Sequence, residues 1–419
     1  MEHQKVLPHL FRTEYRKMIA VLVRLFGTEF LAVAEDIVSD SFLAATELWG
    51  LKGLPENPAG WLYVTAKNKA LDHLRRNKIF SDKVAPRLTS NATAFADTFD
   101  FDLSDNYVKD SQLAMLFTVC DPVNKPAGQI ALALNLLCGF GASEIAAAFL
   151  TDREVIYKRL QRAKKLLQDK ALAVRQPSKK EIRERLPQVL LIIYLLFNEG
   201  YYSESPDKVI REELCQEAMR LGILLTESPL TALPSTYALL ALMCFHGSRF
   251  DARQDNNGAQ VLYQDQNRDR WDHALINKGR YYLQKATTRG AGAGRFHLEA
   301  GIAFWHSFPE EQPEKWEQIL KLYDLLLEQH YTPMAALNRI YALSKVAGKQ
   351  KALLAMEEIH LSRHYLYHSL LAELYTDLDN QKAALHLKRA VELSTSPAGR
   401  RILDGKLRVL TNRASLRKP

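Results

Sequence analysis

The sequence predicts an all-α protein. Apolar residues recur at three- and four-residue spacing through most of the 419 residues, which is the pattern of amphipathic helices. No stretch of useful length alternates apolar and polar residues as a half-buried strand would. Glycine, proline and asparagine divide the chain into blocks of helix length. We therefore expect helices packed on helices, in two small N-terminal modules followed by one large C-terminal module.

The composition favours a chain with sizeable buried cores. Hydrophobic residues make up 47% and charged residues 25%, enough for about two to three domains. No apolar run approaches the roughly 20 residues that cross a bilayer, and we expect a cytoplasmic protein that makes no membrane contact. The cysteines show no metal-ligand spacing, so we expect them to be core residues, and we expect no metal and no cofactor. They are Cys120, Cys138, Cys215 and Cys244.

The first module is predicted to span residues 1–78. Helical spacing occurs twice over residues 9–49, and Gly27 separates the two blocks. Residues 50–60 are rich in chain breakers and predict a loop. A third helical pattern then runs from Trp61 to about Lys78.

An acidic linker is predicted next, over residues 79–110. Within it, residues 96–110 contain five aspartates and one lysine, with few strong helix formers. Helical spacing resumes at Ser111, and a second module is expected over residues 111–175. The end of this module overlaps a basic segment, residues 151–185, which holds twelve Lys and Arg against five Asp and Glu. Much of the chain's net charge of +8 therefore lies in this segment.

The second module has helix-turn-helix dimensions. The pattern predicts a short helix capped by Ser143 and ending at Phe149, a turn over residues 150–152, and a second helix from Arg153. The apolar side of the second helix holds Val155, Ile156, Leu160, Ala163 and Leu167. Its other side offers candidate contacts to duplex DNA: Tyr157, Lys158, Gln161, Arg162, Lys164 and Lys165. The alternative is a solvated basic face on an ordinary surface helix, and spacing alone does not separate the two.

The third helix of the first module carries a different candidate surface. One side combines an aromatic ring, an amide and cations, the groups that bind unpaired bases and their backbone. These candidates are Trp61, Thr65, Asn68, Lys69, Arg75 and Arg76. In the alternative, Trp61 packs against the core and the arginines interact with the negative C-terminal end of the helix dipole. Without further evidence of function, these residue types favour the alternative.

Together the two modules resemble a known family. Residues 34–45 and 57–76 resemble region 2 of extracytoplasmic-function (ECF) sigma factors of the sigma-70 family, and residues 144–149 and 157–166 resemble region 4. The resemblance implies a bacterial subunit that binds core RNA polymerase, directs it to promoter DNA and opens the −10 element. Such a subunit has no catalytic activity of its own.

The resemblance also implies roles for individual residues. Five helix residues match the part of region 2 that binds the clamp helices of the β′ subunit: Glu35, Asp36, Asp40, Ser41 and Phe42. The loop 52–59 and the helix after it match the element that captures a flipped −10 base, with Asn68 at a contact position. Region 4 would place Lys158 and Arg162 against the −35 major groove and contact the β flap, and the acidic linker would pass through the RNA exit channel.

More than half of the chain follows region 4. Residues 190–202, 211–221 and 265–276 resemble the extension of an ECF subgroup, so we assign residues 186–419 to an extension. A tetratricopeptide-like repeat is predicted near residues 335–393, with Ala372, Tyr375, Ala383, Leu387 and Ala390 at the repeat spacing. Stacked helix pairs favour a platform that binds a regulatory protein or small molecule. The alternative is a bundle that only stabilises the DNA-binding half.

The sequence is compatible with three functions. The leading one is a sigma factor with a regulatory C-terminal extension. The second is a stand-alone helix-turn-helix regulator with a tetratricopeptide-like sensor domain. The third is an enzyme in the C-terminal half, suggested by the charged residues 265–270. That segment lacks a nucleophile–base pair, a phosphate loop and a metal-ligand set, so we expect no catalysis.

Overall fold

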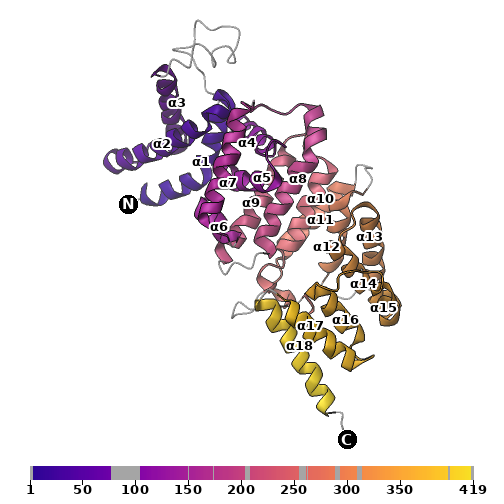
Figure 1. Cartoon of the computed structure of the whole chain (residues 1–419). Coiled ribbons are helices and arrows are strands. Elements are labelled where there is room, and N and C mark those ends of the chain that lie inside the picture. Colours follow the sequence, from indigo (N-terminus) through magenta and orange to yellow (C-terminus); the bar gives the residue numbers. More distant parts are fainter. Residues whose placement is uncertain are drawn as a thin grey trace. The chain divides into compact units, whose positions relative to one another are not determined.

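The computed structural model describes most of the chain, and its described residues form helices and no strand (Figure 1). They are residues 3–76, 104–149, 151–172, 174–202, 208–253, 261, 263–287, 293–308, 314–394 and 397–416. The all-α prediction is therefore confirmed for them. Every helix in these ranges is too short or too polar to cross a lipid bilayer. The chain divides into two compact units, residues 1–231 and 232–419.

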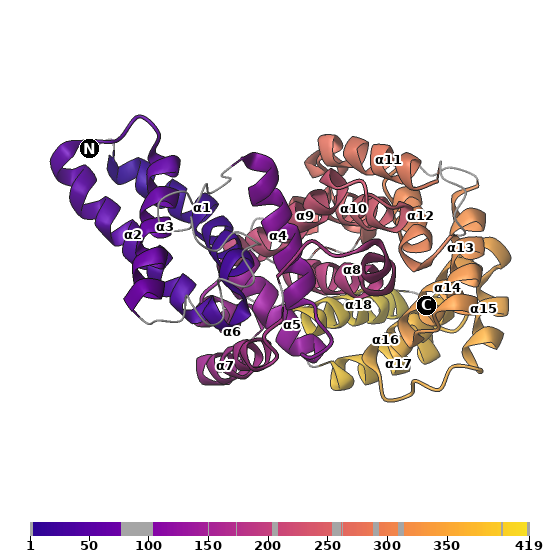
Figure 2. The same ribbon diagram turned by 90° about the horizontal axis from the view of Figure 1, so that it is seen from above.

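Unit 1 begins with the three predicted helices, which pack on one another (Figures 1 and 2). They are α1 (His3–Phe26), α2 (Leu31–Lys52) and α3 (Pro58–Arg76). Gly27 separates α1 from a short 3-10 turn. Its φ is 94°, a conformation that favours glycine. The loop before α3 is shorter than predicted. Asn57 caps α3, its Oδ1 accepting from Gly60 N at 2.9 Å, and Pro58 supplies a first residue that needs no hydrogen-bond partner.

The second group of helices starts earlier than the sequence pattern indicated. Residues 77–103, which hold most of the predicted linker, lie outside the described residues. Helix α4 (Asp105–Val119) begins six residues before the predicted Ser111, because Ser104 Oγ accepts from Tyr107 N at 3.3 Å and caps it. The guanidinium of Arg24 from α1 also lies over the Tyr107 ring at 4.4 Å. Tertiary contact thus extends the helix into the acidic segment.

Two short helices and one longer helix follow α4. They are α5 (Pro126–Leu132), which continues into a π-helical turn (Ala133–Leu137), α6 (Ala142–Ala148) and α7 (Arg153–Asp169). The two helices predicted around residues 143–153 are therefore present. Ser143 is not the N-cap of α6, however. The helix begins at Ala142, and the carboxylate of Glu144 accepts from Gly141 N at 2.6 Å, which satisfies the first free backbone donor.

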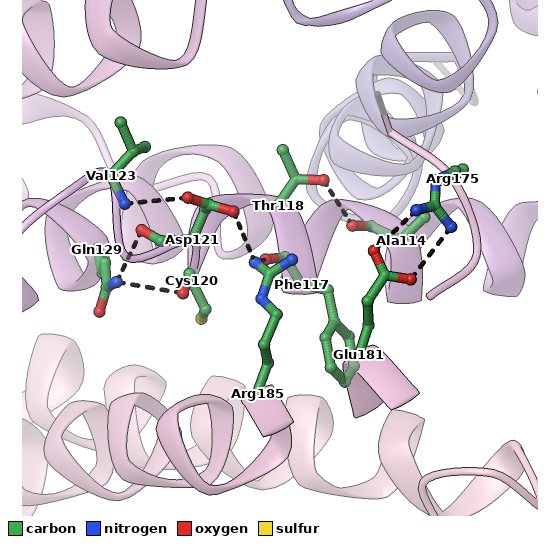
Figure 3. Close-up of polar contacts among 10 residues, drawn as sticks. All are labelled: Ala114, Phe117, Thr118, Cys120, Asp121, Val123, Gln129, Arg175, Glu181 and Arg185. Carbon is green, nitrogen blue, oxygen red and sulfur yellow. Dashed lines mark hydrogen bonds and ion pairs between the residues drawn. The ribbon is translucent and has the colours of Figure 1, made fainter. Parts of the chain in front are cut away.

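The first two helices of the predicted extension belong to unit 1. They are α8 (Lys179–Tyr202) and α9 (Lys208–Glu227), which pack on each other and on α4. Figure 3 shows how Arg185 of α8 reaches the end of α4. Its guanidinium donates to the carbonyl of Phe117 and lies 3.2 Å from Asp121 Oδ2. Nearby, Gln129 Nε2 donates to the Cys120 and Asp121 carbonyls at 3.1 and 2.9 Å. Gln188 of α8 in turn donates to Gln129 Oε1 at 2.8 Å, so partly buried polar contacts join α8 to the second module.

Unit 2 is a succession of antiparallel helix pairs. The helices are α10 (Pro234–Gly247), α11 (His273–Thr287), α12 (Arg295–His306), α13 (Lys315–Gln329), α14 (Pro333–Ala347), α15 (Lys349–Met356), α16 (Tyr365–Tyr375), α17 (Asn380–Leu393) and α18 (Pro397–Leu416). Short 3-10 turns occupy parts of the stretch between α10 and α11. Three apolar clusters follow one another along α12–α18. Each helix contacts its neighbours in sequence, so the cores are local.

The predicted core residues can be checked in both units. All four cysteines are free and buried, as expected. Burial raises the pKa of Cys120, Cys138 and Cys244 to about 12, so these thiols are unreactive packing groups. At the predicted repeat, Ala372, Ala383, Leu387 and Ala390 are buried in one cluster between α16, α17 and α18, with Tyr375 packed against it.

Candidate nucleic-acid interface

Helix α7 presents the exposed basic surface that its sequence predicted. Ile156, Leu160, Ala163 and Leu167 are buried on one side. Five of the six DNA-contact candidates are exposed on the other: Tyr157, Lys158, Gln161, Arg162 and Lys165. Val155 is 43% exposed and therefore does not belong to the buried side. Lys158 Nζ lies 3.2 Å from Glu154 Oε1, one turn earlier in the helix. This surface pair costs little to break, so it leaves Lys158 available to a phosphate.

The sixth candidate, Lys164, contacts the first module instead of solvent. Its Nζ lies 2.6 and 2.8 Å from the two carboxylate oxygens of Glu35 on α2. Both side chains are about one quarter exposed, so this pair is less screened by water than a surface pair. The buried Thr28 Oγ1 lies within hydrogen-bond distance of the Leu167 and Leu172 carbonyls, at 3.0 and 3.2 Å. The end of α7 is thereby held against the turn between α1 and α2.

The candidate single-strand surface on α3 is partly packed. Trp61 is half-buried, and its ring lies 5.4 Å edge-on from the buried ring of Trp49. Asn68 and Arg75 are exposed, whereas Thr65 and Lys69 are half-buried. The Arg76 side chain lies outside the described residues. The structure thus supports the packing alternative for Trp61, and it leaves Asn68 and Arg75 accessible on the same helix.

The candidate partner-binding residues of α2 fall into two groups. Asp36 and Asp40 are exposed. Ser41 and Phe42 are buried, with 0% and 5% of their surface exposed. The Ser41 hydroxyl donates to the Ile37 carbonyl at 2.7 Å, and the Phe42 ring packs edge-on against Phe11 at 5.1 Å. Ser41 and Phe42 therefore hold α2 in place and present no surface to a partner.

The sequence analysis missed part of the exposed face of α2. Leu43 and Glu47 are exposed, Leu43 to 59%, and they follow Asp36 and Asp40 at spacings of three and four residues. These four residues share one face of the helix, which we call the α2 stripe. This face can offer a partner both negative charge and apolar contact area. The signal was in the sequence, because Leu43 falls on the acidic face and not on the apolar one.

Comparison with known proteins identifies two regions of the chain. Sigma-70 region 2 matches residues 10–79, which include α2, α3 and the part of α1 from Leu10 onward. A family of unknown function (DUF6596) matches residues 185–287. The first match indicates a sigma-factor role, with binding to core RNA polymerase and promoter DNA. No solved structure matches the chain.

A relative of similar length extends the comparison over nearly the whole chain. The "Uncharacterized protein R00370" of Rhizobium meliloti (strain 1021) is 32% identical over 387 residues, which cover 90% of this chain and 89% of that protein. Similarity of this extent includes both units. The chain therefore belongs to the family of that protein, with a sigma-70 region 2 in its N-terminal part and a DUF6596 region in its C-terminal part.

Proposed function

We propose that the protein is an ECF-type sigma factor that directs core RNA polymerase to specific promoters, with a regulatory C-terminal extension. The α2 stripe within the region 2 match carries this proposal. Its carboxylates complement the mainly basic and polar clamp helices that the family resemblance implies as partner, and Leu43 adds apolar contact area. Ser41 and Phe42 support the stripe from the core side of the helix.

The two nucleic-acid surfaces would act on different promoter elements. The exposed face of α7 has the width and charge to read the −35 major groove, with Arg162, Lys158 and Lys165 on phosphates or guanines and Gln161 on adenine. Asn68 and Arg75 of α3 would contact the opened −10 strand. Trapping unpaired bases favours the melted state, so strand opening would need no ATP hydrolysis by this subunit.

The contact between α7 and α2 bears on how these surfaces are used. Lys164 is a candidate DNA contact and Glu35 a candidate polymerase contact, yet they bind each other. Because the Glu35 carboxylate already neutralises the Lys164 ammonium group, a DNA phosphate would compete with Glu35 for it. The paired arrangement is therefore the one we assign to the free protein.

Charge reversal on the α2 stripe tests the proposal. Asp36→Lys and Asp40→Lys together should weaken binding to core polymerase by tenfold or more, because they oppose the basic partner. Binding is measured by fluorescence anisotropy of the labelled full-length chain. The control is Glu357→Lys with Glu358→Lys, which changes net charge equally at two exposed residues of unit 2. Equal affinity for both variants would reject the assignment of the stripe.

Transcription with core polymerase and genomic fragments tests the function as a whole. A sigma factor should support specific initiation only when core polymerase is present. If the chain protects duplex DNA by itself and gives no specific transcript with core polymerase, it is a stand-alone helix-turn-helix regulator and the proposal is wrong.

A further inference from the structure

Unit 2 contains a cavity of about 790 Å³ that the functions above do not use. It is lined by side chains of α12, α13, α14, α16 and α18, together with residues between α10 and α11. Figure 1 shows these helices in the orange and yellow part of the chain. The volume lies within the range of roughly 300–1,000 Å³ that is typical of small-molecule sites.

Aromatic rings form a continuous wall of this cavity. The His306 ring lies 5.1 Å from the Tyr263 ring and 5.7 Å from the Trp316 ring. Trp316 in turn lies 5.6 Å from Tyr341. All three contacts are edge-to-face, which fixes the rings relative to one another. Because neighbouring rings are nearly perpendicular, a flat aromatic molecule can stack on one ring and meet the edge of the next.

The charges around the cavity are strongly biased. Among the described residues that line it, the cations are Arg249, Arg268, Lys345 and Lys406, and the only acid is Glu373. Glu373 Oε2 lies 3.6 Å from Lys406 Nζ, which leaves a surplus of three cations. Two of these cations lie over aromatic rings of the wall, Arg249 over Tyr263 at 5.3 Å and Lys345 over Tyr341 at 5.1 Å. Positive charge is thus placed where the rim of a stacked ligand would lie.

A further lysine and a buried imidazole lie behind the aromatic wall. Lys315 is fully buried, and its Nζ lies 3.4 Å from the Tyr263 hydroxyl. His306 Nδ1 is shielded from solvent and has no hydrogen-bond partner among the residues that the structure describes. Burial, with the charges of Arg249 and Lys315 nearby, lowers the pKa of His306 to about 3, so the ring is neutral at pH 7. A neutral imidazole without a partner can still accept or donate one hydrogen bond.

We propose that this cavity binds a small, planar, aromatic anion, such as a carboxylate or sulfonate carried on fused or linked rings. A ring of the wall stacks on the aromatic part, and Lys345, Arg268 and Arg249 hold the anionic group. The Glu373–Lys406 pair lies between this cavity and a second cavity of about 710 Å³, because both residues line both cavities.

The proposed site names the class of ligand that the regulatory extension would bind. Binding itself does not depend on the proposed function, whereas any effect of the ligand on transcription does. Ligand binding is measured on the full-length protein without polymerase. The absence of binding would overturn this inference and leave the sigma-factor proposal standing. Binding without specific transcription would contradict the sigma-factor proposal and leave the site intact.

Two matched probes test the chemistry of the site. The anionic probe is 8-anilinonaphthalene-1-sulfonate, and its neutral counterpart N-phenyl-1-naphthylamine has the same rings without the sulfonate. Fluorescence titration should give saturable 1:1 binding of the sulfonate that is at least tenfold tighter than binding of the neutral probe. Equal affinity for the two probes would show that the cations do not select an anion and would overturn the proposal.

Substitutions of lining residues test whether the sulfonate probe binds in this cavity. Lys345 is exposed at the rim, so Lys345→Met alone, and with Arg268→Met, should weaken sulfonate binding about tenfold for each charge removed and leave the neutral probe unaffected. Tyr341→Leu should weaken both probes. Lys351→Met, at an exposed lysine of α15, is the control and should change neither. The proposal is wrong if Lys345→Met and the control bind the sulfonate with the same affinity. It is also wrong if an octaglutamate peptide displaces the sulfonate and binds more tightly than the sulfonate does.

Discussion

Adjacent residues of α2 have different roles because helical geometry separates them. Asp40 is exposed, whereas Ser41 and Phe42 are buried against α1 and the helix backbone. The family resemblance implied one shared role for these residues. The structure divides them into a contact surface and its support, since neighbouring residues in a helix point about 100° apart.

Lys158 and Arg162 allow a test of the α7 surface at the level of single charges. We expect Lys158→Ala with Arg162→Ala to lower the slope of log affinity against log salt for −35 duplex DNA by about two, since each phosphate contact releases roughly one counterion. Lys179→Ala with Lys180→Ala is the control, because both residues are exposed on α8. Filter binding over a range of salt concentrations gives both slopes. Identical slopes for the two variants would remove these residues from the interface.

His306 predicts a pH dependence of stability. An unfolded histidine takes up a proton near pH 6.5, whereas folded His306 does so only near pH 3. The unfolded state therefore binds more protons between these values, and the free energy of unfolding falls as the pH is lowered from about 6.5. The loss reaches on the order of 1 kcal/mol per pH unit.

His306→Phe keeps an aromatic ring at this position and removes the titrating group. Urea unfolding of the full-length variant at pH 7 and pH 5 should show a smaller loss of stability than the original chain. His330→Phe is the control, because His330 is exposed to water in the folded chain. A loss as large in His306→Phe as in the original chain would contradict the prediction.

At the scale of elements, a glycine sets the distance between α10 and α11. A Cβ atom added at Gly279 of α11 would lie 2.7 Å from Cε1 of Phe245 on α10. Phe245 is 1% exposed and has no space into which to move. The two helices pack closely because residue 279 lacks a side chain.

Two glycine substitutions should therefore have opposite effects. Gly279→Ala should lower the free energy of unfolding by about 1–3 kcal/mol through overpacking. Gly405→Ala should raise it by up to about 1 kcal/mol, because nothing lies within 4 Å of a Cβ there and alanine favours the helix α18. Urea midpoints of the two full-length variants give the comparison. Stabilisation by Gly279→Ala would show that α10 and α11 are not closely packed at that residue.

At the scale of the molecule, the boundary between the two units at residue 231 lies well after residue 186, where the extension is predicted to begin. Helices α8 and α9 are part of unit 1, and α8 is fixed to α4 by Arg185. The α9 residue Glu217 reaches α1, where Arg16 Nη1 lies 2.8 Å from its carboxylate. A cut at residue 185 would therefore remove α9 and most of α8, which pack on α4, α5 and α6, whereas a cut after residue 231 would follow the boundary between the units.

Two truncations test this boundary. The chain 1–231 should be monodisperse and unfold cooperatively. The chain 1–185 should aggregate, because it loses Val189, Ile193, Leu196 and Phe197, each at most 1% exposed. Burial of about 1.5–3 kcal/mol per side chain makes that loss comparable to the stability of a whole domain. Size-exclusion chromatography and thermal circular dichroism distinguish the outcomes. A monodisperse 1–185 chain with an equal melting temperature would place the boundary before α8.

The sequence by itself determined the helical class, the three helices of region 2, and the buried and exposed sides of α7 apart from Val155 and Lys164. These features follow from apolar spacing and chain breakers, which act within one or two turns of a helix. The start of α4 at Asp105 was missed because apolar spacing does not register the local cap by Ser104, and because Arg24 of α1 also holds Tyr107.

Only the tertiary structure decided which helices cover one another and which charges meet. The Lys164–Glu35 pair joins residues 129 positions apart, and the aromatic wall of the unit 2 cavity joins Tyr263 to Tyr341 through His306 and Trp316. No local pattern encodes such contacts. They arise because each amphipathic helix must bury its apolar face against another, and the packing that results sets which polar groups come within reach.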